Sequence, residues 1–140
     1  MKLRHTLCMV LALIVFSSIA VYAIDLDENL PPDIPAPYTG VSSIGATLSI
    51  NSVGKATCSG YVNLKSGYTA SATLSLQQKQ GSSWFTIISW SATGGPTISI
   101  SKSYYVASGY SYRVVMTAAV YDNNSNYVET VSATSTVVYY

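Results

Sequence analysis

Apolar and polar residues alternate along most of the chain beyond residue 40, and the alternation is longest at residues 109–121. Successive side chains of a β-strand point to opposite faces of the sheet, so a two-residue period predicts a strand with one buried face. The odd positions of this segment mix Ser, Arg and Thr with apolar residues, whereas the even positions are all apolar. The predicted buried face consists of Tyr110, Tyr112, Val114, Met116, Ala118 and Val120.

Three earlier segments show the same period, and turn-forming residues separate them. Asn, Gly and Ser interrupt the pattern at residues 51–54, 63–67 and 80–83, where turns are expected. After a Gly-Gly-Pro break, Ile98 and Ile100 mark a shorter strand. The three longer segments place inward the sets Ile44, Ala46, Leu48 and Ile50; Ala56, Cys58, Gly60 and Val62; and Ala70, Ala72, Leu74 and Leu76.

The segment at residues 84–90 differs from the others, because both of its faces are apolar. A strict two-residue period places Trp84, Ile88 and Trp90 on one face, and Phe85 and Ile87 on the other. Large exposed apolar patches are uncommon on soluble proteins. We therefore expect one of these faces to be covered by another part of the chain or by a partner.

Together these segments amount to about seven strands without helical periodicity, and the last strand is predicted over residues 128–140. Short strands at such intervals predict an all-β fold, an antiparallel immunoglobulin-like β-sandwich. Tyr112, which lies three residues after Gly109 and directly before Arg113 just inside the long strand, resembles the tyrosine corner of that class. A small barrel is the alternative, because a strand count does not distinguish a closed sheet from two stacked sheets.

The first 38 residues do not share this pattern. Residues 1–23 combine basic residues, an apolar run and a Val-Tyr-Ala sequence, which is typical of a secretory signal peptide; an uncleaved anchor is the alternative, although the run is short for a span of about 20 residues. Residues 24–38 contain four acids and four prolines, which predicts an extended acidic tether. The predicted organisation is a signal peptide (1–23), an acidic Pro-rich tether (24–38) and one β-sandwich domain (39–140).

Removal of the signal peptide would limit the chemistry of the secreted protein. The only histidine, His5, and one of the two cysteines would leave with it, so Cys58 would have no internal disulfide partner. Stability would then depend on the core, which a chain of about 100 residues can build. From Tyr38 onward, five basic residues stand against only Asp122 and Glu129, a net charge of about +3. This charge is too dilute for a nucleic-acid interface.

Catalytic groups are scarce in the predicted domain. Without histidine it has no Ser-His or Cys-His pair and no imidazole ligand for a metal. Asp122 and Glu129 flank one predicted loop and are the only carboxylates available for hydrolysis. We therefore expect that the protein is not an enzyme and has no catalytic residues, no metal site and no cofactor.

Two features allow sharper hypotheses. The oxygen-bearing side chains at residues 122–126 suit calcium, but Tyr127 and Ala133 stand where such a loop needs Gly and Glu. A plain turn is the simpler interpretation, because Asn and Asp favour turns. Cys58 shares a face with Val62, which predicts a buried core thiol; an intermolecular disulfide is the alternative.

Aromatic residues exceed what the predicted core requires, since eleven of the twelve tyrosines lie beyond the signal peptide. Exposed aromatic side chains on a rigid sandwich can stack on sugar rings or anchor a protein interface. Ordinary cross-strand pairing is the alternative role. The binding residues predicted on this ground are Trp84, Phe85, Ile87, Tyr104 and Tyr105.

The chain also resembles a known family through a series of short motifs. These are Leu76-Gln77-Gln78-Lys79, Trp84, Tyr112-Arg113-Val114, Glu129 and the closing Val138-Tyr139-Tyr140. In this order they are similar to a family of small secreted proteins of Gram-positive (Firmicutes) bacteria, catalogued as a domain of unknown function. The resemblance extends from about Tyr38 to Tyr140. It implies an extracellular bacterial protein and provides no catalytic residue to transfer.

Three functions are compatible with these features. The first is a secreted, non-catalytic binding or adhesion module that recognises an extracellular glycan or protein through residues 84–88. The second is a structural subunit that self-assembles through edge strands with little charge. A small secreted toxin or inhibitor fits the size and the export but has no motif of its own. We expect no nucleic-acid partner and no membrane span in the mature chain.

Overall fold

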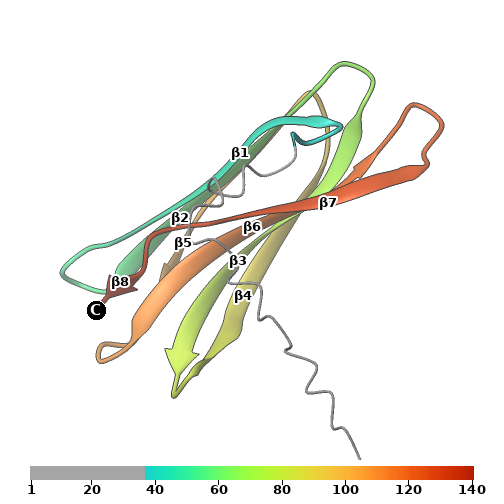
Figure 1. Ribbon diagram of the computed structural model, residues 1–140. Helices are drawn as coiled ribbons and strands as arrows, with labels where there is room; N and C mark the ends of the chain where they lie inside the picture. Colours follow the sequence, from blue (N-terminus) through green and yellow to red (C-terminus); the bar gives the residue numbers. More distant parts are fainter. Residues whose placement is uncertain (1–36) are drawn as a thin grey trace, which may run out of the picture. The chain divides into compact units, whose positions relative to one another are not determined.

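The computed structural model describes residues 37–140, which form eight strands in two antiparallel sheets (Figure 1). Sheet A has the order β1-β2-β5, and sheet B has the order β4-β3-β6-β7 with β8 beside β6. The strands are β1 (Val41–Ile50), β2 (Lys55–Leu64), β3 (Thr69–Gln80), β4 (Ser83–Gly94), β5 (Thr97–Tyr105), β6 (Ser111–Tyr121), β7 (Tyr127–Thr134) and β8 (Val138–Tyr139). The predicted all-β class and antiparallel sandwich are confirmed.

The predicted signal peptide and nearly all of the predicted tether lie outside the described residues. Within residues 37–140 no helix is long and apolar enough to cross a membrane.

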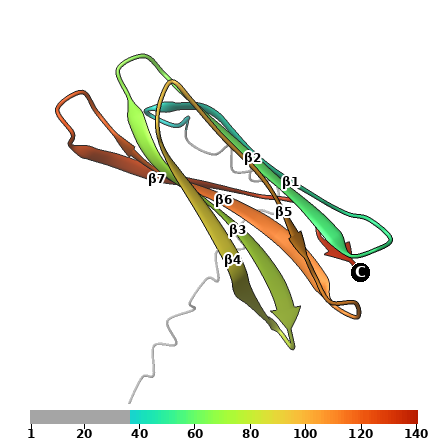
Figure 2. The same cartoon turned by 180° about the vertical axis from the view of Figure 1, so that it is seen from behind.

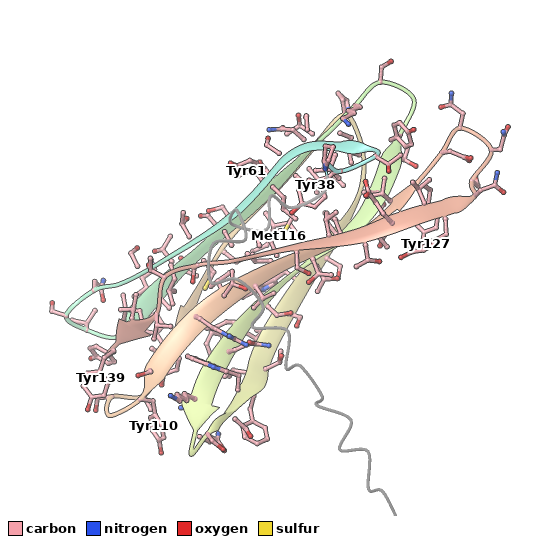
Figure 3. The ribbon with its side chains drawn as sticks, in the orientation of Figure 1. Tyr38, Tyr61, Tyr110, Met116, Tyr127 and Tyr139 are labelled. Atoms are coloured by element: carbon pink, nitrogen blue, oxygen red, sulfur yellow. The ribbon has the colours of Figure 1, made fainter. Side chains whose placement is uncertain are left out.

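The core lies between the two sheets and is built from the predicted inward positions. The even-numbered residues at 56–64 of β2, 70–76 of β3 and 112–120 of β6 are all buried and face the opposite sheet. Gly60 of sheet A faces sheet B at close range: a Cβ atom there would be 2.6 Å from Leu74 Cδ1 and 2.9 Å from Met116 Sδ. Both of these side chains come from sheet B, and Figure 3 labels Met116 between the sheets. The missing side chain at Gly60 therefore makes room for two large ones.

The start of β6 is fixed by a buried hydroxyl. Tyr112 is fully buried, and its hydroxyl donates a hydrogen bond to the Ala107 carbonyl, five residues upstream, at 2.5 Å. Gln78 Nε2 donates to the same hydroxyl at 3.1 Å. This bond to an upstream carbonyl is the defining contact of a tyrosine corner. The narrower immunoglobulin-like assignment stays a prediction.

Tyr110 does not belong to the core, so that part of the predicted buried face is wrong. β6 begins at Ser111, and Tyr110 lies before it with 42% of its surface exposed. Its backbone pairs with Tyr140 instead, through the Tyr110 N–H to the Tyr140 carbonyl and the Tyr140 N–H to the Tyr110 carbonyl. The turn at Gly109, whose φ is 91°, carries the chain out of the core just before the strand begins.

The predicted last strand over residues 128–140 is also wrong in extent. β7 ends at Thr134, and β8 contains only Val138 and Tyr139. Ser135 stands between them: its N–H donates to the Val114 carbonyl, and its Oγ accepts a hydrogen bond from the Val114 N–H, both at 2.9 Å. Because Ser135 is buried, its side chain takes over a backbone pairing that a continuing strand would have made.

The turns gather in two groups at opposite ends of the domain (Figures 1 and 2). The register explains this, because Gln78 pairs with Tyr112 at one end of the β3–β6 ladder and Thr69 pairs with Tyr121 at the other. We call the end with the turns at residues 51–54, 81–82 and 106–110 the aromatic end. The end with the turns at residues 65–68, 95–96 and 122–126 is the acidic end.

We predict that Gly60→Ala lowers the free energy of unfolding by about 1–3 kcal/mol, because the added methyl group must displace Leu74 and Met116 in a close-packed core. Urea denaturation measures the change. Ser49→Ala, on an exposed position of β1, serves as the control and should shift stability by less than about 0.5 kcal/mol. Equal stability of the two variants would contradict the contact between the sheets at Gly60.

Candidate functional site

β4 carries three of the five predicted binding residues and is an edge strand of sheet B. Leu76 pairs with Ile88, but the next residue of β3, Gln77, pairs with Thr86, so Ile87 is an extra residue in β4. Such a β-bulge shifts the alternation of side chains by one position. The prediction that Trp84 shares a face with Ile88 and Trp90 is therefore wrong.

Because of the bulge, residues 84–86 of β4 point to the sheet faces opposite to those that a strict two-residue period predicts. Trp90 and Ile88 face the interior and are half-buried against the core, as predicted. Phe85 lies opposite Gln78, which puts it on the same inner side, although 51% of it stays exposed near the β3–β4 turn. Trp84 lies opposite Lys79 on the outer face of sheet B. Ile87, at the bulge itself, is 37% exposed.

On that outer face, Trp84 is part of a contact that spans three strands. The guanidinium carbon of Arg113 lies 4.3 Å from the centroid of the Trp84 ring. Arg113 Nε donates to Gln77 Oε1 at 2.8 Å, and Gln77 Nε2 donates to Thr86 Oγ1 at 3.3 Å. We call Trp84, Thr86, Gln77, Lys79 and Arg113 the Trp84–Arg113 patch. An exposed cation–π contact contributes about 0.5–1 kcal/mol, which is enough to orient the guanidinium.

β5 brings Tyr104 and Tyr105 to the aromatic end. Tyr104 pairs with the buried Ala56, so it points inward and packs half-buried against the core. Tyr105 pairs with Lys55 and lies on the outer face of sheet A, 67% exposed. The five predicted binding residues therefore share one half of the domain but not one face, since Trp84 and Tyr105 lie on the outer faces of opposite sheets.

Other exposed apolar residues gather at the same end. Tyr110 and Tyr139 lie together there (Figure 3), and Tyr139 is the most exposed of the large apolar side chains. Val53, at the tip of the β1–β2 turn, is exposed as well. Tyr127 lies near the acidic end (Figure 3), where its ring meets Tyr121 edge to face at 6.1 Å. Among residues 37–140, the exposed aromatic side chains of Phe85, Tyr105, Tyr110 and Tyr139 therefore lie toward the aromatic end, whereas those of Tyr38, Tyr61 and Tyr127 lie toward the acidic end.

Charged groups divide between the two ends in a similar way. By strand register, four of the five cations of the described domain lie in the half nearer to the aromatic end, whereas both side-chain carboxylates lie toward the acidic end. The four are Lys55, Lys79, Lys102 and Arg113; Lys65, Asp122 and Glu129 lie toward the acidic end.

Asp122 uses its carboxylate to close its own loop. Oδ1 accepts hydrogen bonds from the Asn124 N–H at 2.8 Å and the Asn126 N–H at 2.9 Å, and Oδ2 accepts one from Asn126 Nδ2 at 3.1 Å. These bonds, that of the Asn126 N–H foremost, hold the pKa of Asp122 below its ordinary value. The arrangement agrees with a plain turn. Residues 37–140 contain no group of three or more His, Cys, Asp or Glu side chains that could hold a metal ion.

Glu129 holds the start of the domain against β7. Its Oε1 accepts a hydrogen bond from the Gly40 N–H at 2.7 Å, and its Oε2 accepts one from the Thr39 N–H at 3.2 Å. Asp122 and Glu129 are thus each engaged by separate backbone amides. Neither carboxylate is arranged as a general acid beside the other.

Cys58 lies in the middle of β2 with no exposed surface, which confirms the predicted core thiol. Burial raises the pKa of the Cys58 thiol to about 11. A sulfur atom without exposed surface cannot meet a second chain while the domain is folded. An intermolecular disulfide at Cys58 is therefore incompatible with this fold.

Two shallow depressions lie on the sheets, and neither contains a predicted binding residue. One, of about 150 Å³, lies on the outer face of sheet A, beside Tyr61 and the hydroxyls of Ser59 and Ser101. The other, of about 240 Å³, lies near the acidic end beside Tyr121 and Ser125. Small-molecule pockets usually measure about 300–1,000 Å³, so both depressions are smaller than such pockets.

Comparison with known proteins adds no assignment: no protein-family model matches the chain, and no curated protein matches it.

Sequence reasoning identified Trp84 but missed the groups that surround it. The sequence pattern placed Gln77 only in a family motif, and Arg113 only in a motif and on the mixed face of the long strand. Neither was predicted to contact Trp84, because that contact depends on strand pairing. A usable signal existed, since Lys79 and Trp84 flank a short turn and therefore lie close in a hairpin. No comparable signal placed Arg113 beside them.

We predict that the Cys58 thiol reacts about 100-fold more slowly with a disulfide reagent in the folded protein at pH 8 than in urea, because the thiolate is the reactive form. Burial favours the protonated thiol, so the associated stability is present below pH 9 and is lost as the pH rises toward 11. Melting temperatures should therefore fall more steeply across this range for the parent protein than for Cys58→Val. Rapid labelling of the folded protein would contradict the buried position.

For Asp122, whose pKa is lowered in the fold, the linked stability is present at neutral pH and is lost as the pH falls below about 3.8 and through the folded pKa. We expect the melting temperature of the parent protein to drop over that acid range, and that of Asp122→Asn to drop less. Thermal melts between pH 2 and pH 6 measure this difference. Equal slopes would show that the carboxylate does not hold the loop, and a rise in melting temperature with added calcium would favour a metal site instead.

Proposed function

We propose that the protein is a secreted, non-catalytic β-sandwich module that binds an extracellular glycan or protein, acting in binding or adhesion at the bacterial cell surface or in its environment. The observation that supports this function is that four exposed aromatic side chains and four of the five cations of residues 37–140 lie in one half of the domain, away from both side-chain carboxylates. Aromatic and Arg side chains dominate binding energies in interfaces. A separation of charge also steers a charged ligand toward one end.

Secretion and a bacterial origin enter this proposal from the predicted signal peptide and from the family resemblance. The immunoglobulin-like assignment belongs here as well. It is supported by the Tyr112 corner and by the strand order, in which the first, second and fifth strands share one sheet and the third, sixth and seventh share the other. Rigid sandwiches of this kind commonly carry binding residues on turns at one end.

A non-catalytic role is supported by how the carboxylates are used. Asp122 is engaged by the amides of its loop, and Glu129 by the amides of Thr39 and Gly40. The thiol of Cys58 is buried and its pKa is raised, which disfavours a nucleophilic role.

Self-assembly is the second candidate, because β4 is a long edge strand without charged residues or proline. The bulge at Ile87 disfavours it, since bulges at edges interrupt further pairing. The edge at β5 carries Lys102, which is on the inward-facing side but exposed, another feature that discourages pairing. Sedimentation of the unliganded protein as a monomer over a wide concentration range would argue against this candidate.

The proposed binding function can be tested with two tyrosines that are similarly exposed at opposite ends. Purified protein is first assayed on a glycan array and in pull-downs from bacterial surface extracts. For a ligand found in this way, either Tyr105→Ser or Trp84→Ser, which change the two opposite outer faces at the aromatic end, should weaken binding about tenfold. Tyr127→Ser, at a residue that is 60% exposed against 67% for Tyr105, is the matched control and should leave affinity unchanged. No binding in either assay, or no loss in either aromatic-end variant beyond that of Tyr127→Ser, would contradict the proposal.

A further inference from the structure

We infer, on the basis of the proposed binding function, that the Trp84–Arg113 patch binds an acidic polysaccharide whose sugars carry carboxylates. In this interaction the guanidinium of Arg113 pairs with a sugar carboxylate, and the adjacent Trp84 ring packs against the sugar. The patch lies on the outer face of sheet B near the aromatic end.

The first support is the geometry of Arg113. Its Nε donates to Gln77 Oε1, and its guanidinium carbon lies 4.3 Å from the centroid of the Trp84 ring, so two contacts hold the group in position. No other side chain among residues 37–140 forms a hydrogen bond with the guanidinium. The two terminal amino groups are therefore left as a planar pair of donors, which matches the two oxygens of a carboxylate.

A second support is the charge of the patch. Lys79 lies opposite Trp84 in register, and Gln77, two residues before it on β3, lies opposite Arg113, so two cations share one face. The side-chain carboxylates of the described domain, Asp122 and Glu129, lie toward the other end and are engaged there by backbone amides. Like charges on one face repel each other. A bound anion would relieve this repulsion.

The surroundings of the patch favour a polysaccharide over other anions. Beyond Thr86, the outer faces of β3 and β4 continue as paired hydroxyls: Ser75 Oγ and Ser89 Oγ are 3.0 Å apart, as are Thr73 Oγ1 and Ser91 Oγ. A row of hydroxyl and amide groups beside an aromatic ring offers hydrogen bonds and an apolar surface to a chain of sugars. The row gives an extended ligand a path along the sheet.

The same surroundings disfavour an anionic lipid surface. Segments that insert into a membrane interface present Trp, Phe or Leu on an apolar face. The β3–β4 turn beside the patch is instead Gln80-Gly81-Ser82-Ser83, and the outer face beyond it is covered by Ser and Thr. A polymer in solution therefore fits the patch better than a bilayer does.

The test measures binding of the purified protein to polygalacturonate, by calorimetry or biolayer interferometry at low ionic strength. Fully methyl-esterified polygalacturonate has the same backbone without the charge and should not bind. Arg113→Gln should weaken binding to the acidic polymer about tenfold. Arg113→Lys, which keeps the charge but not the planar donor pair, should lose most of that affinity as well. Lys65→Gln removes the same charge at the acidic end and should change affinity less than twofold.

Three results would overturn the inference. Equal losses of affinity in Arg113→Gln and Lys65→Gln would show that binding depends only on the overall charge of the protein. Equal binding of the esterified polymer would show that the sugar carboxylate is not recognised. Binding to phosphatidylglycerol vesicles but not to polygalacturonate would identify a lipid surface instead. Thermal melts of each variant confirm that it is folded.

Failure of this inference can be told apart from failure of the proposed function. If another glycan or a protein binds and Tyr105→Ser weakens that binding, the module still binds through its aromatic end, and only the acidic polysaccharide is wrong. If no ligand of any class binds, both proposals fall.

Discussion

The contact between the two sheets at Gly60 is the constraint on which the rest of the domain depends. Leu74 and Met116 of sheet B reach across the interior to the place where Gly60 lacks a side chain. The described residues contain a single, unpaired cysteine, so no disulfide holds the sheets together. Burial of apolar surface between them is then the main stabilising term. The buried positions of Tyr112 and Cys58 exist only because the sheets meet in this way.

Close apolar packing stabilises the middle of the sandwich, whereas hydrogen bonds of individual side chains hold its two ends. At the acidic end, the carboxylates of Asp122 and Glu129 bind backbone amides and hold the loop and the start of the domain in place. At the aromatic end, Tyr112 bonds to the Ala107 carbonyl. The residues around it, Tyr105 and Tyr110 among them, remain exposed. At the acidic end, the carboxylates are therefore engaged in hydrogen bonds that hold the fold, whereas the aromatic end has aromatic and cationic side chains on its surface.

The bulge at Ile87 connects this division to the proposed binding surface. Without the extra residue, Trp84 would point to the same side as Trp90, and Phe85 would point outward. With it, Trp84 faces outward and meets the guanidinium of Arg113. The same bulge interrupts an uncharged edge strand, which limits further pairing at β4. One local irregularity thus both exposes the aromatic ring and helps to protect the edge.

The sequence by itself determined the strands and most of their buried faces, because a two-residue period is a local signal that each strand carries alone. The inward residues of β2, β3 and β6 followed from it, and so did the half-buried Trp90 and the turn at residues 122–126. Only the tertiary structure decided the pairing of strands, the bulge, the replacement of strand pairing by Ser135 and the exposure of Tyr110. In residues 84–88 both faces are apolar, so alternation could not reveal a one-residue shift. The meeting of Trp84 with Arg113 had no local signal either, since residues far apart in sequence become neighbours only when their strands pair through β3.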